Sequence, residues 1–190
     1  MVLTFNSSGM LFPGDHDCTF GDLRNSILVL GPATPPTKWD ASWRGRLVDK
    51  LEVLVSQLWS VDVHEITIGG SFAEETPRPT DIDGYFACDP RKYYQGVLQE
   101  QLNRIDPYAV WKWDRSDLRR DSRGGLQTPM WHRYRIDLWP NTGQPTGEID
   151  EDGNDVYFPT RLRSSRDGLP RGVIRIAKPL GAQDRVHILS

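Results

Sequence analysis

The feature that most constrains the fold is a long amphipathic stretch, followed at once by a β-branched run that ends in two glycines. Four leucines within residues 42–59 recur at spacings of 4, 3 and 4, which places them on one face of a helix. They are Leu47, Leu51, Leu54 and Leu58. Asp40 or Ser42 can cap the start of this helix. Residues 61–68 are rich in valine and isoleucine, as buried strands are, and Gly69-Gly70 stops the run.

Patterns of the same two kinds follow along the chain. Residues 91–105 predict a second amphipathic helix, and residues 26–30 predict either one helical turn or a strand. Further strands are predicted at 81–88, 108–113, 133–139 and 172–177. Strands that alternate with helices indicate an α/β or α+β fold with a mixed β-sheet and flanking helices.

Composition excludes several classes of protein. Lys and Arg number 23 against 26 Asp and Glu, a net charge of −3, which disfavours a generally basic nucleic-acid clamp. No apolar run approaches the ~20 residues of a membrane-spanning helix, and residues 1–14 lack the pattern of a secretory signal. Two cysteines, Cys18 and Cys88, are too few for a disulfide framework. We therefore expect a cytoplasmic protein with reduced thiols and no membrane partner.

Candidate chemistry begins where the strand at 61–68 ends. Gly69-Gly70 turn the chain tightly, and Ser71 then opens a predicted short helix. Glycines at such a turn allow backbone N–H groups to approach a phosphate closely, and the Ser71 hydroxyl adds one more donor. A plain tight turn has the same sequence, so this motif is not specific when taken alone.

A pair of aspartates follows the turn. Asp81 and Asp83 lie two residues apart in a strand-like run, so both carboxylates project from one face of the sheet. Adjacent carboxylates repel each other, and a cation between them relieves that repulsion. Mg²⁺ takes oxygen ligands and is commonly held by one or two carboxylates together with substrate phosphates. The alternative is a solvent-facing pair in a loop, against which the Gly-Ser turn upstream argues.

A third carboxylate, Asp137, lies in the strand predicted at 133–139. Apolar and polar residues alternate there, so Asp137 shares the polar face with Arg135. A strand aspartate between large apolar residues is costly unless it is paired or binds a metal. Asp137 is therefore either a third metal ligand or the partner of Arg133 or Arg135 in an ion pair.

Together these residues resemble a known family. Gly70-Ser71, nine intervening residues, Asp81-Ile82-Asp83 and the later Asp137 are similar to the signature of the polymerase-β-like nucleotidyltransferases. This resemblance covers about residues 45–140. Two further phrases, at 12–17 and 167–176, resemble the ends of an uncharacterised branch of short bacterial members.

The resemblance implies the polymerase-β-like nucleotidyltransferase fold and a two-metal reaction on a nucleoside triphosphate such as ATP. Asp81 and Asp83 would ligate two Mg²⁺ ions, which Mn²⁺ can replace. Asp137 would ligate the catalytic metal and help to deprotonate an acceptor hydroxyl, which attacks the α-phosphorus as pyrophosphate leaves.

The resemblance further implies that the glycine turn binds the nucleotide, through Gly69, Gly70 and Ser71. The chain departs from the family's pattern at two points. The family often has a basic residue directly after the Gly-Ser turn, whereas residues 72–75 here contain none, and Arg78 is the nearest candidate. The position after the aspartate pair is usually apolar in the family and is Gly84 here.

The same resemblance, with the two end phrases, implies a single nucleotidyltransferase domain over residues 1–190. Within it we expect an N-terminal arm at 1–40, a catalytic core at 41–140, and an acidic loop with a basic C-terminal extension at 141–190. Glu148, Asp150, Glu151, Asp152 and Asp155 make the loop acidic, and it is predicted to be solvated.

The acceptor is left open by the sequence. Residues 112–135 contain seven basic and three acidic residues with tryptophan and tyrosine among them, which suits the seat of an RNA end. The same pattern also fits core tryptophans beside a solvated face of arginines. We expect transfer of a nucleoside monophosphate to a hydroxyl of RNA, tRNA or protein.

The alternatives belong to other classes. One is transfer to a small hydroxylated molecule such as an antibiotic, for which the acidic loop could supply an anionic pocket. Another is a catalytically inactive nucleotide-binding module that regulates a partner. Resemblance alone suggests a toxin or defence component with an antitoxin-like protein partner.

Overall fold

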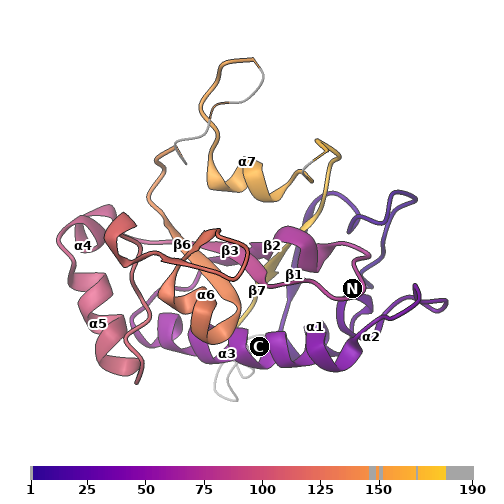
Figure 1. The fold of residues 1–190 in the computed structure, drawn as a ribbon, viewed down its shortest axis with the longest axis horizontal. Helices are drawn as coiled ribbons and strands as arrows, with labels where there is room; N and C mark the ends of the chain where they lie inside the picture. The colour runs from indigo at the N-terminus through magenta and orange to yellow at the C-terminus, as the bar shows by residue number, and fades with distance from the viewer. Residues whose placement is uncertain (1, 146–148, 150–151, 166, 179–190) are drawn as a thin grey trace, which may run out of the picture.

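A computed structural model describes residues 2–145, 149, 152–165 and 167–178 of the chain. The fold is α+β, with a mixed five-stranded sheet and flanking helices (Figure 1). In spatial order the strands are β1 (Asp15–Cys18), β7 (Val173–Ile176), β2 (Ile66–Gly69), β3 (Ile82–Ala87) and β6 (Ile136–Asn141). The β1–β7 and β3–β6 pairs are parallel, whereas β7–β2 and β2–β3 are antiparallel. A separate hairpin joins β4 (Arg119–Arg120) to β5 (Leu126–Gln127).

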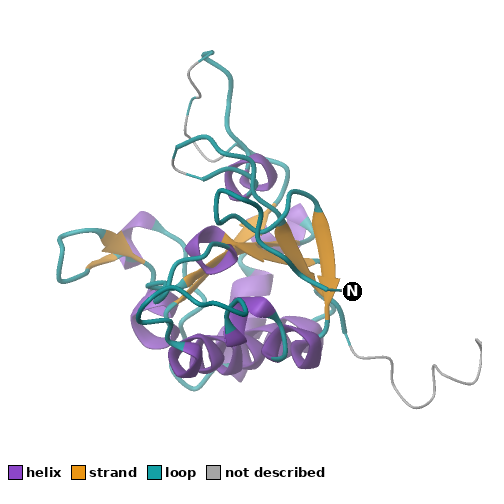
Figure 2. Cartoon of the chain, turned by 90° about the vertical axis from the view of Figure 1, so that its right-hand side faces the viewer, coloured by secondary structure: helices purple, strands orange, loops and turns teal. Residues whose placement is uncertain are grey.

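Most helices lie on one side of the sheet and α7 lies on the other (Figures 1 and 2). The α-helices are α1 (Phe20–Arg24), α2 (Ile27–Leu30), α3 (Ala41–Ser60), α4 (Pro90–Tyr94), α5 (Val97–Ile105), α6 (Pro129–Tyr134) and α7 (Phe158–Leu162). Two 3₁₀ turns, η1 (Gly70–Ala73) and η2 (Arg115–Asp117), complete the described elements.

The main core lies between the sheet and α3. The four leucines predicted for one helix face are fully buried, and the Asp40 side chain caps α3 by accepting from the Trp43 backbone N–H at 2.8 Å. Against them pack the alternate strand residues Ile66, Ile68, Ile82, Phe86, Ile136, Leu138, Ile174 and Ile176. The opposite sheet face carries Asp83, Asp137 and a small cluster of Tyr85, Leu162 and Val173, to which α7 contributes Leu162. One face of the sheet is therefore core and the other is available for chemistry.

The structure confirms several predicted elements and corrects others. The helix at 42–59 and the strands at 81–88 and 172–177 are present with small changes in their bounds. The helix at 91–105 is broken in two because Gly96, at φ 74°, interrupts it. The strand at 61–68 starts only at Ile66.

Two strand predictions need larger corrections. Residues 108–113 contain no strand. Residues 133–134 end α6 rather than starting a strand, because Thr128 caps a helix that Pro129 opens. The segment at 26–30 is helical.

The expectation that residues 1–40 form an arm laid on the domain is wrong. They contribute β1 to the main sheet and buried side chains, among them Leu11 and Leu23, to the core. Parts of the predicted acidic loop, including Glu148, Asp150 and Glu151, lie outside the described residues, as does the C-terminal extension beyond Lys178. Both cysteines are free thiols. None of the described helices is both long and apolar enough to cross a membrane.

Candidate active site

One row of register partners joins the three sequence motifs. Gly69, the last residue of β2, pairs with Asp83 of β3, and Asp83 pairs in turn with Asp137 of β6. Because β2 runs antiparallel to β3, its carboxyl end meets the amino ends of β3 and β6 at one edge of the sheet. The Gly-Ser turn that follows Gly69 and the carboxylates of Asp83 and Asp137 are therefore at the same edge, with Asp81 just ahead of β3.

The glycine turn lies directly against one of these carboxylates. Gly70 begins η1 with φ +66°, and a Cβ placed on it would lie 2.1 Å from the Asp83 Oδ2 atom. No side chain other than hydrogen fits there without moving the carboxyl group. Gly84 is constrained in another way, because a Cβ there would lie 2.6 Å from the carbonyl oxygen of Thr67. That close approach explains why glycine follows the aspartate pair.

A buried arginine of α3 holds the turn and the chain that leads from it to Asp81. Arg44 is fully buried, and its guanidinium donates to the carbonyl oxygens of Leu28, Phe72, Glu74 and Thr76 at 2.6–2.9 Å. It also lies over the Trp39 ring, 4.2 Å from the ring centroid. Desolvation lowers the pKa of Arg44 to about 9, and the four carbonyls offset much of the cost of the buried charge. Arg44 therefore fixes the backbone of η1 at Phe72 and of the chain that follows it at Glu74 and Thr76.

The two outer carboxylates are held by indole and hydroxyl donors. The Trp131 Nε1–H donates to Asp81 Oδ2 at 2.6 Å. Asp137 accepts from the Thr128 hydroxyl at 2.7 Å and from the Trp139 Nε1–H at 2.8 Å. Thr128 also caps α6, so the helix start and the third carboxylate share one side chain. These donors orient the two carboxylates without neutralising them.

The electrostatics at this edge disfavour full ionisation. Burial, followed by the nearby carboxylates of Asp81 and Asp137, raises the pKa of Asp83 to about 7, while Arg161 and Arg171 act in the opposite direction. Burial also raises the pKa of Asp137, which its hydrogen bonds with Thr128 and Trp139 partly counteract. The three carboxylates thus form a cluster of negative charge that favours a proton or another cation.

A segment from the C-terminal part of the chain covers this edge. Arg171 is buried just before β7, donates to the Leu162 carbonyl oxygen at 3.0–3.1 Å and forms an ion pair with Glu74, which follows η1. Leu162 itself lies over Gly69 and Val173. On the other side, Arg163 pairs with Asp15 of β1. Leu162, Arg163 and Arg171 therefore tie the C-terminal part of the chain to the glycine turn and to the first strand.

The donor set at this edge of the sheet fits a hard divalent cation. Across the described ranges, no three or more His, Cys, Asp or Glu side chains make a group that could hold a metal ion. Asp81 and Asp137 are instead oriented by their indole partners. The chemistry at this edge, three carboxylates with a raised pKa at Asp83, is nevertheless the oxygen-rich and negatively charged environment that Mg²⁺ and Mn²⁺ prefer.

The structure brings Asp81, Asp83, Asp137, Gly69, Gly70 and Ser71 to one edge, but it places Arg78 elsewhere. Arg78 pairs with Asp40 at the start of α3 and lies over the Trp43 ring. The alternative in which Asp137 pairs with Arg133 or Arg135 is wrong. Arg133 lies over the Tyr108 ring and Arg135 over the Trp131 ring instead. Two arginines from another segment act electrostatically at this edge, Arg161 on both Asp83 and Asp137, and Arg171 on Asp83.

Sequence reasoning missed Arg44, Thr128 and Trp139 of this site. It placed Trp131 among the aromatic residues of a possible RNA seat, and it left open whether the C-terminal arginines, Arg161 and Arg171 among them, serve the triphosphate, RNA or a protein partner. Of the missed residues, only Trp139 had a local signal, because it lies two residues after Asp137 on the same face of a strand. The others come from segments that meet the site only in the folded chain.

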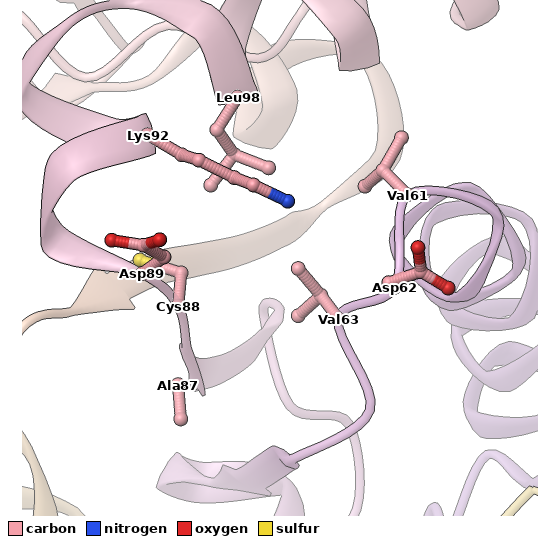
Figure 3. A pocket seen from close by; sticks show the side chains of 8 residues that line it. All are labelled: Val61, Asp62, Val63, Ala87, Cys88, Asp89, Lys92 and Leu98. Carbon is pink, nitrogen blue, oxygen red and sulfur yellow. The ribbon is translucent and has the colours of Figure 1, made fainter.

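A cavity of about 230 Å³ lies at the opposite edge of the sheet, where β3 ends (Figure 3). Its lining includes Val63, Cys88, Lys92 and Leu98, with the Lys92 side chain extended across it. Burial raises the pKa of the Cys88 thiol to about 11, so this thiol is a poor nucleophile at neutral pH. This cavity shares no residue with the carboxylate edge.

Comparison with known proteins assigns the chain to a family, but the family has no described activity. Residues 3–177 match a family described as a family of unknown function, DUF6932. The match spans nearly the whole chain, and the chain belongs to this family. No curated protein and no solved structure matches it.

Proposed function

We propose that this DUF6932 member is a divalent-metal-dependent nucleotidyltransferase of the polymerase-β-like fold. It would transfer a nucleoside monophosphate from a nucleoside triphosphate to a hydroxyl of a macromolecule. The observation that carries the proposal is the register row of Gly69, Asp83 and Asp137 across three neighbouring strands, with Asp81 beside it.

The glycine turn supplies the phosphate-binding part of the proposal. Backbone N–H groups of a glycine turn form an anion-binding concavity, and the absence of a side chain at Gly70 leaves room for close approach. Ser71 is only partly exposed and adds a hydroxyl. Arg44 and Arg171 keep the turn in place, through Phe72 and Glu74 respectively. A triphosphate at this turn would lie next to the Asp83 carboxylate.

The carboxylates supply the cation-binding part. Asp81, Asp83 and Asp137 would hold Mg²⁺ or Mn²⁺, and when bound such ions neutralise phosphate charge and lower the pKa of a coordinated hydroxyl. After burial, the carboxylates of Asp81 and Asp137 raise the pKa of Asp83, and a bound cation would relieve the same repulsion. Arg161 adds a second positive group from α7, suited to the charge of the phosphates.

The reaction needs one proton acceptor. The oxygen of the acceptor hydroxyl forms a bond to the α-phosphorus, the bond from that phosphorus to the bridging oxygen of the β-phosphate breaks, and pyrophosphate leaves. The hydroxyl proton goes to Asp137, whose raised pKa brings it nearer to neutral pH and so makes it a better base than an exposed aspartate. Thr128 and Trp139 hold this carboxylate in position while it accepts the proton.

The test is transfer of label from α-labelled ATP, CTP, GTP or UTP in the presence of Mg²⁺, with total RNA or cell lysate as acceptor. Label on RNA or on a protein band supports the proposal, and label on a small molecule moves the acceptor to the alternative class. The double variant Asp81→Asn, Asp83→Asn should lose labelling by at least about a hundredfold. A matched control is Asp62→Asn, Asp114→Asn, because both aspartates are exposed and remote from the sheet edge. Nucleotide binding without transfer to any acceptor would identify a binding module instead.

A further inference from the structure

One tryptophan on the surface of α3 is surrounded by three cations. The Arg46 guanidinium, the Lys50 ammonium and the Arg78 guanidinium lie over the Trp43 ring, at 5.6, 5.9 and 4.6 Å from its centroid. The Trp43 indole N–H donates to the Pro79 carbonyl oxygen at 2.7 Å, two residues before Asp81. This basic surface therefore borders the chain that carries the first carboxylate.

The same surface continues across α6. Arg135 lies over the Trp131 ring at 3.8 Å, and Arg133 lies over the Tyr108 ring at 3.7 Å. Trp131 is the residue that donates to Asp81, so this part of the surface also borders the carboxylate edge. We call Arg46, Lys50, Arg78, Arg133 and Arg135, with the rings beneath them, the basic strip.

The cations of the basic strip are close enough to repel one another. Lys50 lies among Arg46, Arg133 and Arg135, and after burial it is these three groups that lower its pKa. Arg78 has a carboxylate partner in Asp40, whereas Arg46 donates to the uncharged Ser42 hydroxyl. Repulsion among like charges lowers stability unless a ligand compensates for it, so the arrangement favours a polyanion.

Arg135 is held in a backbone conformation that arginine rarely adopts. It ends α6 with φ +60° and ψ +35°, in the left-handed region where glycine or asparagine would be less strained. This strained conformation directs the chain from α6 into β6 while the guanidinium lies over the Trp131 ring. Strain of this kind commonly accompanies a functional side chain.

Beyond Arg133 the basic strip reaches a cavity of about 360 Å³. Its lining includes Tyr108, Lys112, Arg119 and His132, and Asp117 is its acidic residue. Lys112 and Asp117 approach each other to 3.8 Å. Tyr108 is more than half exposed, so an aromatic ring is accessible at the mouth of this cavity.

We infer that the basic strip binds a single strand of RNA and brings its end to the carboxylate edge. Guanidinium planes supported by aromatic rings can stack on unpaired bases, while their charge attracts the phosphates. An acidic protein partner would pair with the positive charges of the strip, but it would have no bases to stack on the guanidinium planes. The inference rests on the proposed function and deepens it by naming the acceptor, and the residues that its test replaces take no part in the transfer itself.

Binding is tested without catalysis, in EDTA and without nucleotide, by fluorescence anisotropy of a short, unstructured, labelled RNA. The variant Arg46→Gln, Lys50→Gln should bind at least about tenfold more weakly than the wild type. Its log–log dependence of affinity on salt should be shallower by about 1.4, since each phosphate contact of a single strand contributes about 0.7. The matched control is Arg91→Gln, Lys92→Gln, which removes the same charges from the exposed α4 and should bind as the wild type does.

Three outcomes with RNA overturn the inference: no binding by the wild type at about 50 mM salt, equal losses in the two variants, or equally tight binding of duplex RNA. Preference for an acidic peptide over RNA also overturns it and assigns the strip to a protein. The inference and the proposed function fail separately. If the protein binds RNA but transfers no nucleotide, the inference about the basic strip holds and the proposed enzyme activity is wrong. If it labels protein but does not bind RNA, the activity is supported and the inference about the strip is wrong.

Discussion

The backbone of Gly70 and the carboxyl group of Asp83 are so close that a methyl group cannot be placed between them: a Cβ on Gly70 would lie 2.1 Å from Asp83 Oδ2. We expect Gly70→Ala to lower the free energy of unfolding by about 2–4 kcal/mol, from the left-handed backbone and the overlap together. Nucleotidyl transfer should fall below detection. Urea denaturation and the labelling assay measure the two effects.

The control for this prediction is Gly96→Ala. Gly96 also has a positive φ, of 74°, but nothing lies within 4 Å of the position of a Cβ. This variant carries the backbone cost alone, about 1 kcal/mol, and should keep full activity. Equal losses of stability in the two variants would show that contact with Asp83 contributes nothing.

The pKa of Asp83 predicts an unusual dependence of stability on pH. Since the pKa rises from an ordinary value of 3.8 to about 7, the folded protein binds this proton more tightly than the unfolded chain does. This group therefore stabilises the metal-free protein most below about pH 4, and its contribution is lost as the pH rises to about 7. Asp83→Asn should remove that dependence and be more stable than the wild type at pH 8, by a few kcal/mol.

This prediction is tested by urea denaturation in EDTA at pH 5 and pH 8, which measures the free energy of unfolding of the wild type and of Asp83→Asn. The free energy of unfolding of the variant should increase relative to that of the wild type as the pH rises. Adding Mg²⁺ at pH 8 should stabilise the wild type, by about 2.7 kcal/mol at a hundred times the dissociation constant, and the variant much less. A difference that does not change with pH would mean that Asp83 titrates normally.

Arg44 is predicted to contribute strongly to stability although it forms no ion pair with a carboxylate in any described contact. Arg44→Met removes the donor for four carbonyl oxygens, two of them in partly buried hydrogen bonds and two in buried ones. We expect a loss of about 3–5 kcal/mol. Arg46→Met, two residues along the same helix and exposed, should change stability by no more than about 0.5 kcal/mol. A small loss for Arg44→Met in urea denaturation would contradict the role of this residue.

Trp131 is predicted to act on the site through Asp81 alone. Trp131→Phe keeps an aromatic ring at this position and removes the N–H that holds Asp81. Mg²⁺ affinity and transfer rate should each fall about tenfold, as is usual when the group orienting a metal ligand is lost. The matched control is Trp113→Phe, which removes an indole hydrogen bond to the Leu138 carbonyl oxygen and should leave Mg²⁺ affinity unchanged. Unchanged affinity in both variants would show that Asp81 needs no indole partner.

The sequence predicts the elements correctly where the local residue pattern and the tertiary packing favour the same structure. The leucine repeat of α3 and its cap at Asp40 are confirmed because one helix face is buried along its whole length. The aspartates could be identified because strand alternation placed Asp83 and Asp137 on polar faces, and the parallel pairing of β3 with β6 then makes them neighbours. That they hold metal and act on a nucleotide stays a prediction.

Other parts of the fold and of the site could not be predicted from the sequence, because the residues that stabilise them are distant from one another along the chain. β1 has the sequence Asp-His-Asp-Cys, with no apolar alternation, and is a strand because it pairs with β7. Asp17 and Arg175, 158 residues apart, form one of the ion pairs between them. Residues 108–113 resemble a strand, yet Trp111 is drawn into a buried hydrogen bond with Gln57 of α3 instead. The basic strip likewise joins α3 to α6, which no window of sequence contains.

The place of β7 in the sheet has a consequence for how the protein is made. This strand comes last among the described elements, yet it lies in the interior, between β1 and β2, and Arg171 just before it braces the glycine turn. A ribosome that has synthesised only the first 170 residues has released β1 and β2 with an open seam between them. The carboxylate edge can therefore be completed only after β7 has been synthesised and released, and a nascent chain that lacks β7 leaves this edge incomplete.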